Sequence, residues 1–195
     1  MTMRTHSLGI SDVLDIQPYN QARKRIDNDR IDELFAYLRV ASKVCHTSTV
    51  KKKLRAERLV FPFIACVLSL LGDGAKLGTD VKVSGDLVHC NVKFEFLLKR
   101  GDRRLCISVA KKGCIRDCTL SRAIAGAEAL ADLEERVTEE VFCVVTDFID
   151  WYFTCLSLDS VVREHYSLTF EDGSPTRATV AAVTEKLYCI LAGGT

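Results

Sequence analysis

A short apolar run in the second half of the chain constrains the fold more than any other feature. The run VFCVVT, residues 141–146, is almost wholly apolar and rich in β-branched side chains. A strand without a polar face must be buried on both faces. The run therefore predicts a central strand in a sheet that has helices on both sides.

Helical periodicity marks the segments that would cover such a sheet. Apolar residues recur at helical spacing from Asn28 to about Lys43. A second helix is predicted to begin after Ser48 or Thr49 and to continue through LVFPFIACVLSLL, where Pro62 either kinks or restarts it. Two further helices are predicted, over 117–136 and from Thr176 or Thr179 to 193–194.

Strands are predicted where the apolar period changes to two, after a GDG turn at 72–74. The predicted strands are 81–83, 92–98, 103–112, 141–146, 151–158 and 166–170. Three consecutive strands followed by a crossover helix and a buried strand give a mixed sheet with helices on both faces. The predicted fold class is therefore α/β, with helical additions at the N- and C-terminal ends.

The length of 195 residues is enough for one domain with a small extension. Residues 1–27 are polar and mixed, which predicts an arm, and 28–195 are predicted to form a single α/β domain. No apolar run approaches the length of a membrane span, and the first residues lack the pattern of a secretory signal. We therefore expect an intracellular protein, in the nucleus or cytoplasm, with no membrane partner. Its nine cysteines are expected to be reduced.

Charge is distributed unevenly along the chain. Residues 1–125 contain 23 Lys and Arg against 13 Asp and Glu, a net charge of +10, whereas residues 126–195 contain 4 against 13, a net charge of −9. Such asymmetry predicts a basic surface for polyanions, and the acidic C-terminal third could receive a protein partner. Chance clustering of surface charges on separate elements explains the asymmetry equally well.

Two neighbouring strands carry the residues that indicate chemistry. An acidic residue on one strand and an acid-x-Lys on the next suit metal-dependent phosphodiester cleavage, because two carboxylates hold Mg²⁺ and the Lys stabilises charge. Glu95 and Lys111 fit this pattern, and alternation places Val109 on the same face as Lys111. The second carboxylate position is therefore occupied by Val109.

Three segments together resemble a known superfamily: VKFEFLLKRGDRRLCISVAKKG, the helix TLSRAIAGAEAL, and VFCVVTDFIDWYFTCLSL. They resemble the restriction-endonuclease-like, or PD-(D/E)XK, superfamily, and within it the nuclease-type domains of crinkler effectors and their eukaryotic relatives. The resemblance covers roughly 57–160, with VVTDFIDW as its most specific part. It implies a core of order αβββαβ, preceded by a helical extension over 28–56 and followed by a strand and helix over 161–195.

The resemblance also implies roles for single residues. Lys111 falls on the lysine of the family motif, Glu95 or Asp86 on its first acidic position, and Glu57 on an accessory acid of some members. If the domain were active, Glu57, Asp86 and Glu95 would be the Mg²⁺ ligands. Val109 stands where the family has Glu, and Arg122 stands where its helix commonly has Gln. Losing a carboxylate should severely weaken Mg²⁺ binding, so we expect a disabled site without a cofactor.

Basic residues form two clusters near these strands, and phosphate contacts are the function that such clusters suit best. The residues predicted to bind nucleic acid, either DNA or RNA, are Lys99, Arg100, Arg103 and Arg104 around one turn, and Lys111, Lys112, Arg116 and Arg122 after the next strand. A solvated surface explains each cluster, taken alone, equally well.

Three functions follow from these patterns. The first is a catalytically degenerate nuclease-like domain that acts as a nucleic-acid-binding or effector-like module. The second is a structural or protein-interaction subunit built on a pseudo-nuclease fold. The third is an active Mg²⁺-dependent nuclease whose missing carboxylate comes from another position, such as Glu57, Asp86 or Asp117.

Overall fold

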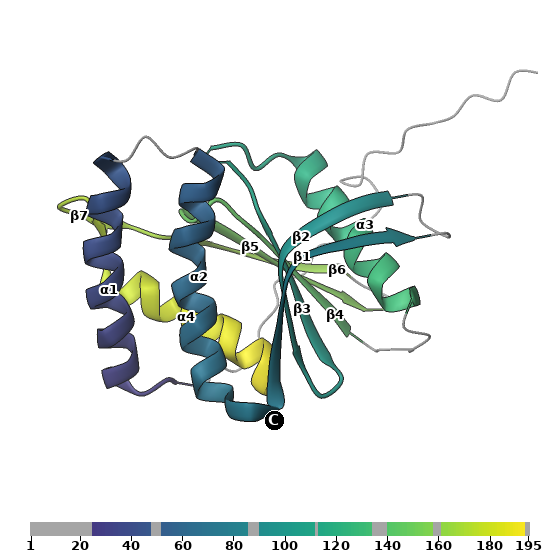
Figure 1. Ribbon diagram of the computed structural model, residues 1–195, viewed down its shortest axis with the longest axis horizontal. Helices are drawn as coiled ribbons and strands as arrows, with labels where there is room; N and C mark the ends of the chain where they lie inside the picture. Colours follow the sequence, from purple (N-terminus) through teal and green to yellow (C-terminus); the bar gives the residue numbers. More distant parts are fainter. Residues whose placement is uncertain are drawn as a thin grey trace, which may run out of the picture.

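The computed structural model describes residues 25–47, 52–85, 90–111, 113–133, 140–157 and 161–193. The predicted polar arm, apart from its last three residues, and the predicted site residues Asp86 and Lys112 lie outside these ranges. In the described part, a six-stranded sheet of order β1-β2-β3-β4-β5-β6 separates two helical layers. Helices α1, α2 and α4 pack on one face, and α3 packs on the other (Figure 1).

The elements confirm the predicted α/β class. The helices are α1 (Asn28–Thr47), α2 (Lys52–Leu71), the short 3-10 helix η2 (Gly72–Gly74), α3 (Asp117–Leu133) and α4 (Arg177–Ala192). The strands of the main sheet are β1 (Ala75–Gly85), β2 (Cys90–Arg100), β3 (Arg103–Val109), β4 (Glu140–Thr146), β5 (Asp150–Ser157) and β6 (Val161–Ser167). A small hairpin of β7 (Phe170–Glu171) and β8 (Ser174–Pro175) precedes α4.

The sheet is mixed in the predicted way. Strands β1, β2 and β3 form an antiparallel meander, and α3 crosses over so that β4 pairs parallel with β3. Strands β5 and β6 then continue antiparallel from β4. The run VFCVVT lies within β4, where Phe142 and Val144 join the core on one face, and Cys143 and Val145 join the core on the other. Burial of this strand on both faces is therefore confirmed.

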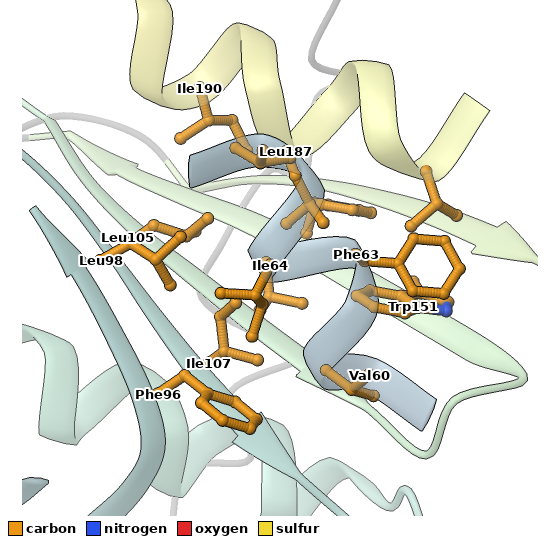
Figure 2. Packing of buried hydrophobic residues seen from close by; sticks show 14 of the residues in the cluster. Val60, Phe63, Ile64, Phe96, Leu98, Leu105, Ile107, Trp151, Leu187 and Ile190 are labelled. Carbon is orange, nitrogen blue, oxygen red and sulfur yellow. The ribbon is translucent and has the colours of Figure 1, made fainter. Parts of the chain in front are cut away.

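The larger core lies between the sheet and α1, α2 and α4 (Figure 2). Phe63 of α2 packs against Trp151 of β5 with ring centroids 5.0 Å apart, and both side chains are fully buried. Leu187 of α4 reaches the same core. Trp151 is thus a central core residue, and this layer fixes α2 against β2 and β3, where the candidate site lies.

Some element boundaries differ from the predictions. Helix α1 continues to Thr47, and α2 is one helix with Pro62 inside it. The strand predicted over 166–170 is wrong, because β6 spans Val161–Ser167 and Phe170 begins β7. Strand β6 lies at the sheet edge and has several half-exposed polar side chains, so its sequence lacks the strong apolar alternation of an inner strand.

Several cysteines lie in the hydrophobic core or beside it. Cys106, Cys143 and Cys189 are buried in the core, and Cys66 is half-buried. Burial also raises the pKa of the Cys143 thiol, which keeps that thiol neutral. These residues act as small apolar side chains.

Candidate functional site

The β1–β2 hairpin bends sharply at one point, and this bend shapes the candidate site. The strand register includes Thr79 with Phe96 and Val81 with Phe94, but it does not include the position between them, Asp80 with Glu95. Asp80 has a φ of 55°, which an L-residue adopts only in an irregular strand. Phe94 packs in the core under α3, whereas Phe96 packs in the core on the opposite face. The outer half of the hairpin therefore curls toward α3 (Figure 1).

Because of this bend, β2 separates from β3 before β3 ends. The last pair between the two strands is Phe96 with Ile107, so the amide of Val109 extends past the ladder on that side. The side chain of Glu95 fills the gap, and its Oε2 accepts a 2.7 Å hydrogen bond from the Val109 N–H. Glu95 is only 5% exposed. The carboxyl group thus replaces the carbonyl that a continuing strand would have supplied.

A second buried carboxyl holds the loop that follows β3. Asp147, directly after β4, accepts a 2.6 Å hydrogen bond from the Gly113 N–H through Oδ2. Its Oδ1 accepts hydrogen bonds from the N–H groups of Ile149 and Asp150, at 3.0 and 2.9 Å. Asp147 and Asp150 thus form the turn between β4 and β5. Sequence reasoning missed that Asp147 is buried and reaches across to another loop.

The same turn is closed by further local hydrogen bonds. Phe148 has a φ of 82°, and its N–H donates to the Thr146 hydroxyl at 3.0 Å. The Trp151 indole N–H donates to the Phe148 carbonyl at 2.9 Å. The segment TDFIDW is therefore a self-bonded turn. The Thr-Asp pair after an apolar strand was the available sequence signal, because both side chains commonly accept hydrogen bonds from following amides.

Lys111 and Val109 occupy different environments. Strand β3 ends at Val109, so the predicted strand over 103–112 is too long and Lys111 lies in the loop, exposed to solvent. Val109 is 2% exposed and belongs to the apolar core that includes Leu105 and Ile107. The position expected to supply a carboxylate therefore contributes to packing instead.

The acids predicted to bind a metal do not form a complete site among the described residues. The pKa of Lys93 is raised, first by its hydrogen bond to Asp80 and further by the charges of Asp80, Glu95 and Glu57. Glu57 of α2 and Glu95 of β2 thus both lie close enough to act on Lys93. Within the described ranges, no three His, Cys, Asp or Glu side chains gather to hold a metal. Asp86, the third predicted metal ligand, lies outside the described ranges.

The first predicted basic cluster has a structural role at the far end of the sheet. Arg100 donates hydrogen bonds to the carbonyls of Leu191 and Ala192, at 3.4 and 3.1 Å, and Arg103 donates to the Ile190 carbonyl at 2.9 Å. These carbonyl groups belong to the last turn of α4, where the helix dipole favours positively charged side chains. Lys99 and Arg104 lie opposite each other in the same hairpin.

The second basic cluster lies at the other end of β3. Six residue steps separate the ends of this strand, Arg103 and Val109, a distance of roughly 20 Å at the usual strand rise. Lys111 follows β3, Arg116 directly precedes α3, and Arg122 lies on α3, and all three are exposed. The two basic clusters predicted to bind nucleic acid therefore lie at opposite ends of β3.

Comparison with known proteins gives one informative match. No protein-family model matches the chain. Over 179 residues, which are 92% of this chain, it is 34% identical to crinkler effector protein 5 of Phytophthora infestans. The chain is homologous to this crinkler effector. It spans about half the length of that protein.

The homology supports the crinkler part of the resemblance that the sequence motifs carry. No helix in the described ranges is both long enough and apolar enough to cross a membrane.

Proposed function

We propose that this crinkler-like chain is a catalytically degenerate nuclease-like domain that binds nucleic acid inside the cell, in the nucleus or the cytoplasm. The observation that carries the proposal is the hydrogen bond between Glu95 and the Val109 amide. It joins the two positions where the PD-(D/E)XK pattern has its paired carboxylates. The carboxylate of Glu95 is buried and accepts a hydrogen bond, and the other carboxylate is replaced by the core side chain of Val109.

Loss of catalysis follows from the chemistry of this pair. Mg²⁺ needs near-octahedral oxygen coordination, and a valine side chain contributes no oxygen. Glu95 has one oxygen accepting a backbone N–H and little contact with solvent. In this proposal the position of Glu95 and Val109, where an active nuclease would bind its metal, is part of the structural core.

Binding is supported by what surrounds the pair. Lys111, Arg116 and Arg122 are exposed between the end of β3 and the first turns of α3. Phosphate oxygens are attracted by such side chains and by the N-terminal end of a helix. Asp147 holds the intervening loop through Gly113, so the loop presents these cations in a fixed position.

Fluorescence polarisation tests the proposal with labelled duplex DNA and labelled RNA at several salt concentrations. A triple variant with Lys111, Arg116 and Arg122 changed to Ala should bind more weakly, with a salt slope smaller by about one per lost phosphate contact. The control is Lys76→Ala, an exposed lysine at the start of β1 that pairs with Lys99 at the other end of the sheet. Absence of binding at low salt, or equal binding by the triple variant and the control, would contradict the proposal.

An active nuclease with a relocated carboxylate is the second candidate. The observation that favours it is that Glu57 of α2 lines the same groove as Phe96, the residue that follows Glu95 on β2. Plasmid and single-stranded substrates should be incubated with Mg²⁺ or Mn²⁺. Cleavage that disappears in both Lys111→Ala and Glu57→Gln would replace the degenerate-domain proposal with this one.

A further inference from the structure

The large apolar side chains that remain exposed are concentrated in one place. Seven such residues occur in the described ranges, and five of them line a single groove between α1 and α2. The five are Tyr37, Val40, Val44, Leu54 and Phe61, with exposed fractions between 42% and 65%. Soluble proteins rarely gather exposed apolar side chains in this way unless the surface contacts a partner.

The groove has the shape of a site for an elongated partner. Tyr37, Val40 and Val44 follow one another at helical spacing along α1, and Leu54 and Phe61 do so along α2. Phe96 of β2 also lines the groove, and its ring centroid lies 6.1 Å from that of Phe61. The open volume is about 590 Å³. Two helices with apolar rows between them offer the surface onto which a third helix packs.

The polar groups beside the groove are biased toward positive charge. Arg58 lines the groove and is exposed, and Lys43 is exposed on α1 next to Val40 and Val44. Glu57 also lines the groove, but its side chain is half-buried, whereas that of Arg58 is exposed. The first turn of α2 contains no acidic residue.

Charge pairing elsewhere on α1 sharpens this contrast. In its first two turns, Arg30 pairs with Glu33, and Asp32 pairs with Arg177 of α4. No ion pair within the described residues involves Lys43 or Arg58. The groove therefore combines an apolar floor with cations that have no acidic partner in the described part of the chain.

We propose that this groove binds an amphipathic helix of a partner protein, with apolar residues at i, i+3 or i+4, and i+7 toward the groove and acidic residues on its flanks. Arg58 is the one cation among the described residues that line the groove, so a nucleic acid would find few ligands for its phosphates there. A second copy of this chain fits poorly, because a two-fold axis through the groove would bring Arg58 and Lys43 close to their own symmetry mates. The proposal is independent of nucleic-acid binding, since the groove shares no residue with the Lys111 cluster.

Designed peptides test the proposal directly on the whole chain. The probe is a fluorescent, side-chain-stapled helix of about four turns with Leu at the groove-facing positions and Glu on both flanks. Two matched peptides carry Lys on the flanks, or Ser in place of Leu. We expect the Glu-flanked Leu peptide to bind at least about tenfold more tightly than either matched peptide.

Variants of the protein locate the binding. Val40→Lys combined with Val44→Lys should weaken binding of the Glu-flanked peptide by about tenfold or more, because both side chains lie at the centre of the apolar row. Phe170→Ser is the control, since Phe170 is exposed and apolar but lies in β7, outside the groove. All three positions are exposed, and circular dichroism will verify that each variant is folded.

A charge-reversal variant distinguishes specific recognition of the peptide from nonspecific hydrophobic binding. Arg58→Glu should weaken binding of the Glu-flanked peptide and strengthen binding of the Lys-flanked one, which a purely structural role for Arg58 would not produce. Equal affinity for the two flanks, or wild-type binding by the Val40/Val44 variant, would overturn the proposal. So would a concentration-dependent dimer, measured by sedimentation, that the Val40/Val44 changes abolish, because a second copy would then be the occupant. Nucleic-acid binding should remain unchanged in every groove variant.

Discussion

At the scale of single residues, two buried carboxyl groups hold the end of β3 and the loop after it. Glu95 satisfies the Val109 amide where β2 has turned away, and Asp147 satisfies the Gly113 amide from the other side. Buried N–H groups cost free energy when they lack an acceptor, so both side chains contribute to the fold.

Asp147→Asn tests this interpretation because both oxygens of Asp147 accept hydrogen bonds from N–H groups. An amide nitrogen cannot accept, so one N–H would lose its acceptor, and we expect the free energy of unfolding to fall by about 1–3 kcal/mol. Urea unfolding measures the change. Asp172→Asn, at an exposed turn between β7 and β8, is the control. An unfolding free energy equal to that of the control would show that these hydrogen bonds contribute little.

At the scale of elements, the bend in the β1–β2 hairpin decides where β3 becomes accessible. The curled half of β2 lies directly on α3, and the contact is possible because α3 has Gly126 at that position. A Cβ atom on Gly126 would lie 2.7 Å from Cβ of Val92 and 3.0 Å from Cζ of Phe94. The absence of a side chain in the middle of a helix therefore lets the curled hairpin approach.

Gly126→Ala should for that reason destabilise the protein despite the better helix propensity of alanine. Propensity would favour the substitution by about 1 kcal/mol, whereas overpacking typically costs about 1–3 kcal/mol, so we expect a net loss of stability. Gly74→Ala provides a control, because a Cβ at Gly74 would meet no atom within 4 Å. Thermal unfolding of both variants measures the difference. A melting temperature for Gly126→Ala at or above that of the wild type would mean that the hairpin can move away from α3 at little cost.

At the scale of the whole molecule, the basic excess of the first 125 residues is divided among separate places. Arg100 and Arg103 bind the carbonyl groups at the C-terminus of α4. A second group of basic residues follows β3 around Lys111, and Arg58 borders the α1–α2 groove. The sequence presents these charges as one asymmetry, but each has a different structural setting.

This division predicts that two sets of substitutions will affect different properties, one set the stability of the protein and the other its nucleic-acid affinity. Changing Arg100 and Arg103 to Ala should lower the free energy of unfolding by about 1–3 kcal/mol, because the last carbonyls of α4 lose charge-assisted hydrogen bonds. It should leave nucleic-acid affinity unchanged. The triple variant at the Lys111 cluster should lose affinity and keep its stability. Urea unfolding and fluorescence polarisation measure the two effects, and loss of affinity in the Arg100 and Arg103 variant would return these residues to the binding surface.

Hydrophobic periodicity reports which faces are buried, so it was sufficient to predict the α/β class, the mixed sheet and the central position of VFCVVT. The motif pattern also identified the replacement at Val109. Three features could not be predicted: the hydrogen bond of Glu95 to the Val109 amide, the capping of α4 by Arg100 and Arg103, and the apolar groove between α1 and α2. Each of them depends on contacts between residues distant in the chain. Such contacts follow from the path of the backbone, for example the bend at Asp80 and Glu95, and local sequence patterns do not encode that path.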